Sequence, residues 1–111
     1  MSILMYTFVI NANRVKALQQ GGSMPLISQF YGILIYIYKE LNSKHHMPHF
    51  HAKYAEFEGV FDFKANFIEG DLPPRQRKLI EAWTLLHEDE LNAAWIAWNE
   101  SGEVIKIEGL R

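Results

Sequence analysis

The residues that could do chemistry in this chain are histidines gathered in one short stretch. His45, His46, His49 and His51 lie close together, and Pro48 precedes the last two. Imidazole is an acid–base group near neutral pH and a common ligand of transition metals. Because the chain contains no cysteine, any metal site would be built from imidazole and carboxylate groups.

A β-hairpin over residues 48–64 is predicted to position these side chains. With Ala55-Glu56 at the turn, opposed residues have numbers that sum to 111, so His49 faces Asp62. Side chains alternate along a strand, and both strands agree on one apolar and one polar face. The apolar face holds Phe50, Ala52, Tyr54, Phe57, Gly59 and Phe61, and the polar face carries His49, His51, Lys53, Glu58 and Asp62.

Two kinds of site fit the polar face. His49 and His51 have Cα atoms about 6.5 Å apart, so both rings could reach one divalent metal ion such as zinc. His46 or Asp62 could be a third ligand. Without a metal, His49 and Asp62 form the histidine–carboxylate half of an acid–base device. The predicted catalytic residues are therefore His49, His51 and Asp62, and the predicted metal ligands are His46, His49 and His51. The competing interpretation is that these histidines only face solvent or a partner.

Apolar runs predict the other strands. Residues 33–38 are β-branched and aromatic, which is typical of a strand buried on both faces and central in a sheet. Ala65-Asn66 is predicted to form a turn, followed by a strand over residues 67–71. A last strand is expected over Val104–Ile107.

One long or two shorter C-terminal helices are predicted after the hairpins. Asp71 offers a capping carboxylate, and Pro73-Pro74 suit a first helical turn. Glu88-Asp89-Glu90 suit the start of a second helix, so a break near His87 is expected. Ser101-Gly102 end the helix. Bulky residues recur at spacings of three or four and form its apolar stripe: Ile80, Trp83, His87, Leu91, Ala94, Trp95 and Trp98. The predicted fold class is α+β, an antiparallel hairpin sheet packed against these helices.

The location of His87 on the apolar stripe predicts a hydrogen-bonded core histidine. If the helix packs on the apolar face of the hairpin, His87 joins His49 and His51 only where the helix end wraps past the hairpin edge.

Charge and composition limit the partners. The chain has 11 basic and 13 acidic residues and a net charge of −2. Residues 1–23 contain two of the bases and no acid, so the remainder carries 9 − 13 = −4. Binding along a nucleic-acid backbone requires a basic surface, so nucleic acid is not favoured. Arg75, Arg77 and Lys78 lie at the predicted helix start, where anions are also favoured, and are predicted to contact a partner or an anion. The competing interpretation is a plain solvated face.

Residues 1–23 are predicted to be an extension, and residues 24–111 a single α+β domain. Residues 2–10 are apolar and suit an extra strand or an upstream start, but a membrane span needs roughly 20 such residues. They also lack the basic start of a signal peptide. Residues 11–20 suit a short polar helix, and Gly21-Gly22-Ser23 suit a linker. A cytoplasmic protein without a membrane segment is expected.

Several motifs together resemble the bacterial domain of unknown function numbered 4160, over about residues 24–108. They are Met24-Pro25, Ile27-Ser28, Phe30-Tyr31-Gly32-Ile33, His46-Met47-Pro48-His49-Phe50-His51-Ala52, Gly70-Asp71-Leu72-Pro73, Trp83, His87, Glu90-Leu91 and Trp95. The resemblance implies a small α+β bacterial protein, frequently encoded beside another small domain in pairs proposed to be toxin–antitoxin-like. It transfers no catalytic residue. The family often has glycine where this chain has Ala55, and an acid where it has Lys44-His45.

These observations predict a small cytoplasmic interaction protein, one member of a two-protein, toxin–antitoxin-like bacterial module. Its partner would be a small protein encoded nearby, bound through aromatic or sheet-edge surface, and a homo-oligomer is a further form of association. Three tryptophans in so small a domain favour some exposed apolar surface. The alternative is a metal-dependent or histidine-based hydrolase, such as a nuclease, that uses the His46, His49 and His51 cluster.

Overall fold

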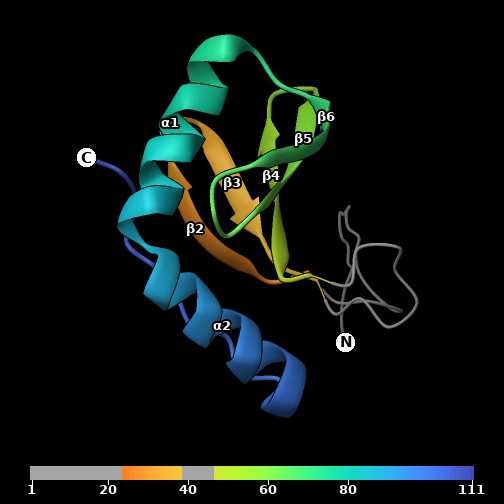
Figure 1. Cartoon of the computed structure of the whole chain (residues 1–111), viewed down its shortest axis with the longest axis vertical. Helices are drawn as coiled ribbons and strands as arrows, with labels where there is room; N and C mark the ends of the chain where they lie inside the picture. The colour runs from red at the N-terminus through yellow and green to blue at the C-terminus, as the bar shows by residue number, and fades with distance from the viewer. Residues whose placement is uncertain (1–23, 39–46) are drawn as a thin grey trace.

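Five antiparallel strands form one sheet, and two consecutive helices lie along one of its faces (Figure 1). The computed structural model describes residues 24–38 and 47–111. The strands lie in sequence order across the sheet: β2 (Leu26–Phe30), β3 (Ile33–Tyr36), β4 (His49–Tyr54), β5 (Phe57–Asp62) and β6 (Phe67–Asp71). The predicted α+β class is confirmed. The strand and helix expected over residues 2–20 lie outside the described residues.

The predicted hairpin register is confirmed. In the β4–β5 pair, Phe50 lies opposite Phe61 and His49 lies opposite Asp62. Ala55 in the connecting turn has φ 53°, and Ala65 in the next turn has φ 70°. Both alanines therefore adopt the left-handed conformation that the tight turns require, at a steric cost that glycine would avoid.

The core lies between the sheet and the helices. Phe50 stacks on Phe61 with ring centroids 5.5 Å apart and meets Trp83 of the first helix edge-on at 5.7 Å. β3 is an inner strand, but the expectation that it is buried on both faces is wrong. Its isoleucines are fully buried, whereas Leu34 and Tyr36 are half-buried, because the helices cover only one face.

The helical segment divides into α1 (Pro74–Leu86) and α2 (Glu88–Ser101), as one of the two predictions had it. The break falls at His87, with φ −125° and ψ 27°, and three acidic residues occupy the first turn of α2. Gly102, with φ 70°, ends α2. The predicted cap at Asp71 is wrong, since Asp71 belongs to β6 and α1 begins after Pro73 without a side-chain cap. Pro74 at the first helical position has no backbone N–H, so the helix start has one donor fewer that a side-chain cap would need to satisfy.

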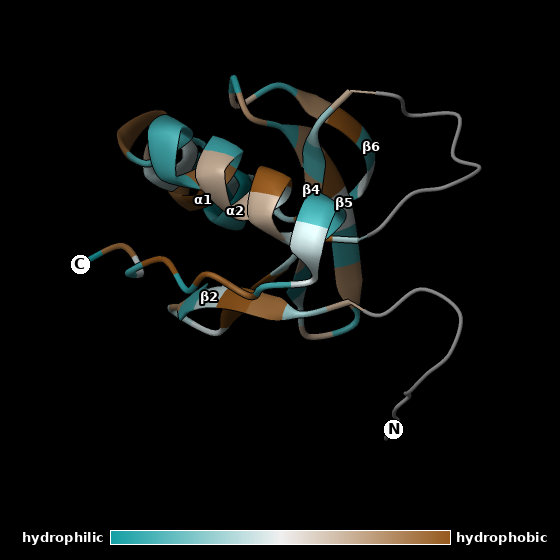
Figure 2. Ribbon diagram, turned by 90° about the horizontal axis from the view of Figure 1, so that it is seen from below, coloured by the Kyte–Doolittle hydropathy of each residue, from teal (hydrophilic) through white to brown (hydrophobic). Residues whose placement is uncertain are grey.

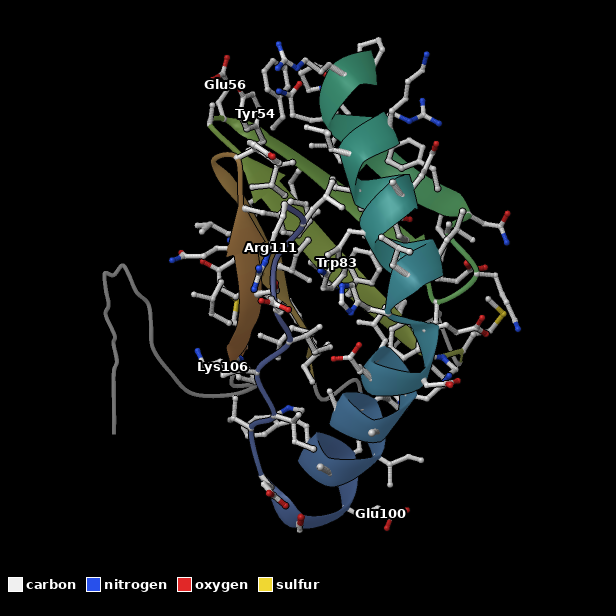
Figure 3. All side chains as sticks on the ribbon, turned by 90° about the vertical axis from the view of Figure 1, so that its left-hand side faces the viewer. Tyr54, Glu56, Trp83, Glu100, Lys106 and Arg111 are labelled. Atoms are coloured by element: carbon white, nitrogen blue, oxygen red, sulfur yellow. The ribbon has the colours of Figure 1, made fainter. Side chains whose placement is uncertain are left out.

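The predicted strand over Val104–Ile107 is wrong, and the segment instead runs beside β2 without a regular ladder (Figure 2). The backbone N–H of Ile107 donates to the carbonyl of Ile27 at 2.7 Å. The β2–β3 register shifts between Leu26 and Ser28, and such an irregularity disrupts the even spacing that a ladder needs. Side-chain contacts anchor the segment as well, because the indole N–H of Trp83 donates to the carbonyl of Glu108 at 2.9 Å (Figure 3).

Neither helix has the length and apolar character needed to cross a membrane, and the same holds for all the described residues.

Candidate functional site

His51 is held between a ring and a carboxylate on the outer face of the sheet, the face turned away from the helices. Its ring stacks on Tyr38 with centroids 3.8 Å apart and an interplanar angle of 27°. Its Nδ1 is hydrogen-bonded to Oε2 of Glu58 at 3.3 Å. The His51 side chain is 15% exposed, and that of Glu58 is 47% exposed. The imidazole is therefore fixed in orientation while its partner carboxylate stays accessible.

The electrostatics of this face centre on Glu58. The hydrogen bond with His51 holds the pKa of Glu58 below its usual value, partial burial acts in the opposite direction, and the charge of Lys53 lowers the pKa further. The ammonium of Lys53 also lies 5.3 Å from the ring centroid of Tyr36. These residues come from β3, β4 and β5 and from the residues just after β3. We call Tyr36, Tyr38, His51, Lys53 and Glu58 the outer-face cluster.

His49 is fully buried at the start of β4. Its Nδ1 lies 2.8 Å from the carbonyl oxygen of Met47. The rings of Trp95 and His51 each lie 5.5 Å from its own. Trp95 comes from α2, so a helical residue does reach the hairpin end. It is Trp95 that contacts His49, and His49 is packed rather than solvent-facing.

Asp62 lies opposite His49 in the register, as predicted, but its carboxylate serves the β5–β6 turn. Oδ1 accepts the backbone N–H groups of Lys64 and Asn66, each at 2.9 Å, and Oδ2 accepts the side-chain amide of Asn66 at 3.0 Å. A carboxylate that accepts several hydrogen bonds in this way stabilises a turn. The geometry therefore gives Asp62 a turn-forming role and adds no support to an acid–base pair with His49.

Only part of the predicted metal site lies among the described residues. His46 lies outside the described residues, and so does His45. Among residues 24–38 and 47–111, no three histidine or acidic side chains are grouped closely enough to hold a metal ion. The ring of His87 is 5.6 Å from that of Trp83, and its Nδ1 is 2.5 Å from Oε1 of Glu90. The metal site at His46, His49 and His51 stays a prediction.

The bases at the start of α1 divide between two environments. The guanidinium of Arg77 lies 4.1 Å from the ring centroid of Phe67 in β6, a cation–π contact that occupies one face of the group. Arg75 and Lys78 are exposed. The structure thus offers two exposed bases here, and their contact with a partner or an anion stays a prediction.

Sequence reasoning missed the tyrosine that stacks on His51. Tyr36 and Tyr38 alternate with Ile35 and Ile37, and the isoleucines are buried against the helices. That alternation places both tyrosines on one face of the strand, and the pairing of Tyr36 with His51 makes this the face of His51. No pattern in the sequence indicates that Trp95 lies beside His49.

Comparison with known proteins identifies the family. An antiparallel sheet of hairpins followed by a broken C-terminal helix is a small α+β domain. The family model described as domain of unknown function (DUF4160) matches residues 32–96, more than half of the 111 residues. The chain belongs to this family, as its motifs indicated. The match includes the hairpin and Trp95, whereas β2 and the C-terminal segment lie outside it. No curated protein and no solved structure gave a match.

Proposed function

We propose that this protein is a small cytoplasmic interaction protein, one member of a two-protein module of the toxin–antitoxin kind. The observation that carries this proposal is the exposed edge of the sheet at β6. β6 is the last strand in the order, and among the described residues its outer edge is paired with no further strand. Such an edge presents backbone N–H and C=O groups to which a strand of another chain can add.

The β6 edge carries negative charge. Glu69 and Asp71 are exposed, and the β5–β6 pairing places Asp71 opposite Glu58 and Glu69 opposite Val60. These three carboxylates therefore share the outer face of the sheet. A partner strand with lysine or arginine at alternate positions would match them, because cross-strand pairs of opposite charge stabilise an antiparallel pair.

The outer-face cluster extends this surface toward the middle of the sheet. Tyr36, Tyr38 and His51 are half-buried. Aromatic side chains that are partly exposed are enriched at protein–protein interfaces, where a ring can bury area while its polar atom finds a partner. An added strand at β6 and a side chain reaching over to these rings together define a protein-binding face.

The proposal is tested by co-expressing the chain with the protein encoded beside it. We expect the two to form a complex of defined stoichiometry in size-exclusion chromatography with light scattering. We also expect growth arrest when one is expressed alone and relief when both are present. Glu69→Lys/Asp71→Lys should weaken the complex, whereas Glu103→Lys, an exposed acid after α2, should not. Separate elution of the two proteins together with unaffected growth would contradict the proposal.

The hydrolase alternative has its own test. Elemental analysis of protein purified without chelator or metal-affinity tag would detect a bound transition metal. The interaction protein is expected to contain none at a stoichiometric level. A stoichiometric metal that is lost in His51→Ala, with the circular dichroism spectrum unchanged, would instead favour the metal enzyme. His51 suits this test better than His49, because removing a fully buried ring would disturb packing.

A further inference from the structure

An exposed stripe runs along both helices on the side away from the sheet. Its members recur at spacings of three or four through the break at His87: Arg75, Lys78, Ala82, Leu85, Leu86, Asp89, Asn92, Ala93 and Ile96. The residues that α1 and α2 bury, such as Trp83 and Leu91, lie on the opposite side of the same helices. The break therefore does not interrupt this surface, which lies on the side of both helices opposite to their buried residues. We call these nine residues the helix stripe.

The largest side chains of the helix stripe are apolar and strongly exposed to solvent. Leu85 is 68% exposed, Leu86 is 69% exposed and Ile96 is 53% exposed. Each apolar Å² removed from water contributes about 25 cal/mol, so covering these side chains would be favourable. Leu85 and Leu86 are adjacent, and exposed apolar side chains that gather on one surface of a small domain can form a site that binds another molecule.

The charges of the helix stripe are divided between its two ends. Arg75 and Lys78 precede the leucines, and Asp89 follows them. Within the described residues, neither Lys78 nor Asp89 forms an ion pair. The two residues are 89 − 78 = 11 positions apart, which is about 16 Å along a helix that rises 1.5 Å per residue. A single copy of the chain therefore cannot pair them.

We propose that the helix stripe is the docking surface for a second copy of this chain, with the two helix pairs antiparallel about a two-fold axis. In such a contact, a residue i that faces j also has j facing i. With the axis midway between Ala82 and Leu85, each Lys78 faces the partner's Asp89. Each Ala82 faces the partner's Leu85, so small and large side chains interlock at the close approach of two helices.

The arrangement of charges along the helix stripe favours a second copy of this chain over another binding partner. The antiparallel arrangement places base against acid twice, whereas a parallel one would place like charges together. This surface differs from the β6 edge, because Glu69 and Asp71 belong to the last strand of the sheet and all nine residues of the helix stripe belong to α1 and α2. The dimer does not rest on the proposed two-protein module, and either could fail without the other.

Sedimentation velocity over a wide range of protein concentration tests the proposal. We expect a monomer–dimer equilibrium, which Leu85→Glu/Leu86→Glu should weaken by at least about tenfold. Val104→Glu is the matched control, because Val104 is an exposed apolar residue outside the helix stripe (41% exposed). It should leave the equilibrium unchanged. Circular dichroism verifies that each variant is folded.

A charge exchange tests the antiparallel pairing itself. Lys78→Glu and Asp89→Lys should each weaken the dimer, because each places like charges together, and the combined variant should restore it. A wild-type protein that stays monomeric at every concentration would overturn the proposal, as would a dimer that tolerates the glutamates at 85 and 86. Failure of the combined variant to recover would overturn the pairing of Lys78 with Asp89. Glu69→Lys should leave the dimer intact, because Glu69 lies on the outer face of the sheet opposite Val60, and this variant separates the dimer surface from the one proposed for the partner protein.

Discussion

Replacing Ala55 by glycine is expected to stabilise the protein. Ala55 is exposed and has φ 53° in the β4–β5 turn, so removing its methyl group loses no packing. A left-handed conformation costs an L-residue about 1–2 kcal/mol. Glycine itself costs roughly 0.5–1 kcal/mol of stability, because it gives the unfolded chain more conformational entropy. The expected net gain in the free energy of unfolding is therefore about 0.5–1 kcal/mol.

The assay is urea unfolding at 25 °C followed by tryptophan fluorescence, with Trp83 as a buried reporter. The midpoint should rise while the slope stays unchanged, since the turn does not alter the surface exposed on unfolding. For a domain of this size the melting temperature should rise by about 2–8 °C.

Two further alanines provide matched controls. Ala65→Gly should also stabilise, because its φ is 70°. Ala93→Gly changes the same atoms at an exposed position inside α2 and should destabilise by about 1 kcal/mol. The reasoning is refuted if Ala55→Gly lowers the free energy of unfolding while Ala93→Gly behaves as expected.

Substitutions at three other residues test the site and the core. The folded pKa of Glu58 lies below its usual 4.5, so its contribution is present above about pH 4.5 and is lost as the pH falls through the folded value. Glu58→Gln should remove this pH dependence from the profile of melting temperature against pH. The free energy of unfolding involved is at most about 0.5 kcal/mol, because the carboxylate is half exposed. Asp62→Ala should cost about 2 kcal/mol in urea unfolding, whereas Asp62→Asn, which keeps an accepting oxygen, should cost less; equal costs would contradict the turn role. Trp83→Phe should cost about 2 kcal/mol by calorimetry, through the lost bond to Glu108 and the smaller ring, and an unchanged melting temperature would count against that anchor.

The hairpin was predictable because its information is local. Side chains alternate with a period of two, so the identities of Phe50 and Phe61 fix the register once the turn is placed. The break at His87 was predictable for a similar reason, since acidic residues favour the first turn of a helix. In each case neighbouring residues carry the whole signal.

The surroundings of the candidate site were less predictable because they depend on tertiary geometry. The direction in which α2 leaves the break brings Trp95 to the ring of the buried His49. The register correctly placed Asp62 opposite His49. It did not predict that the carboxylate of Asp62 would accept hydrogen bonds from the turn and not from the imidazole. The position of the C-terminal segment depends on contacts with Ile27 and Trp83, which are distant in sequence.

The position of the C-terminal segment has a consequence for biosynthesis. β2 leaves the ribosome early, whereas the residues that flank it, among them Ile107 and Glu108, leave almost eighty residues later. Until then the carbonyl of Ile27 and the indole of Trp83 lack their final partners. Formation of these two hydrogen bonds therefore waits for release of Ile107 and Glu108 from the exit tunnel, and a nascent chain stalled before Ile105 would leave the carbonyl of Ile27 in β2 open to neighbouring polypeptides.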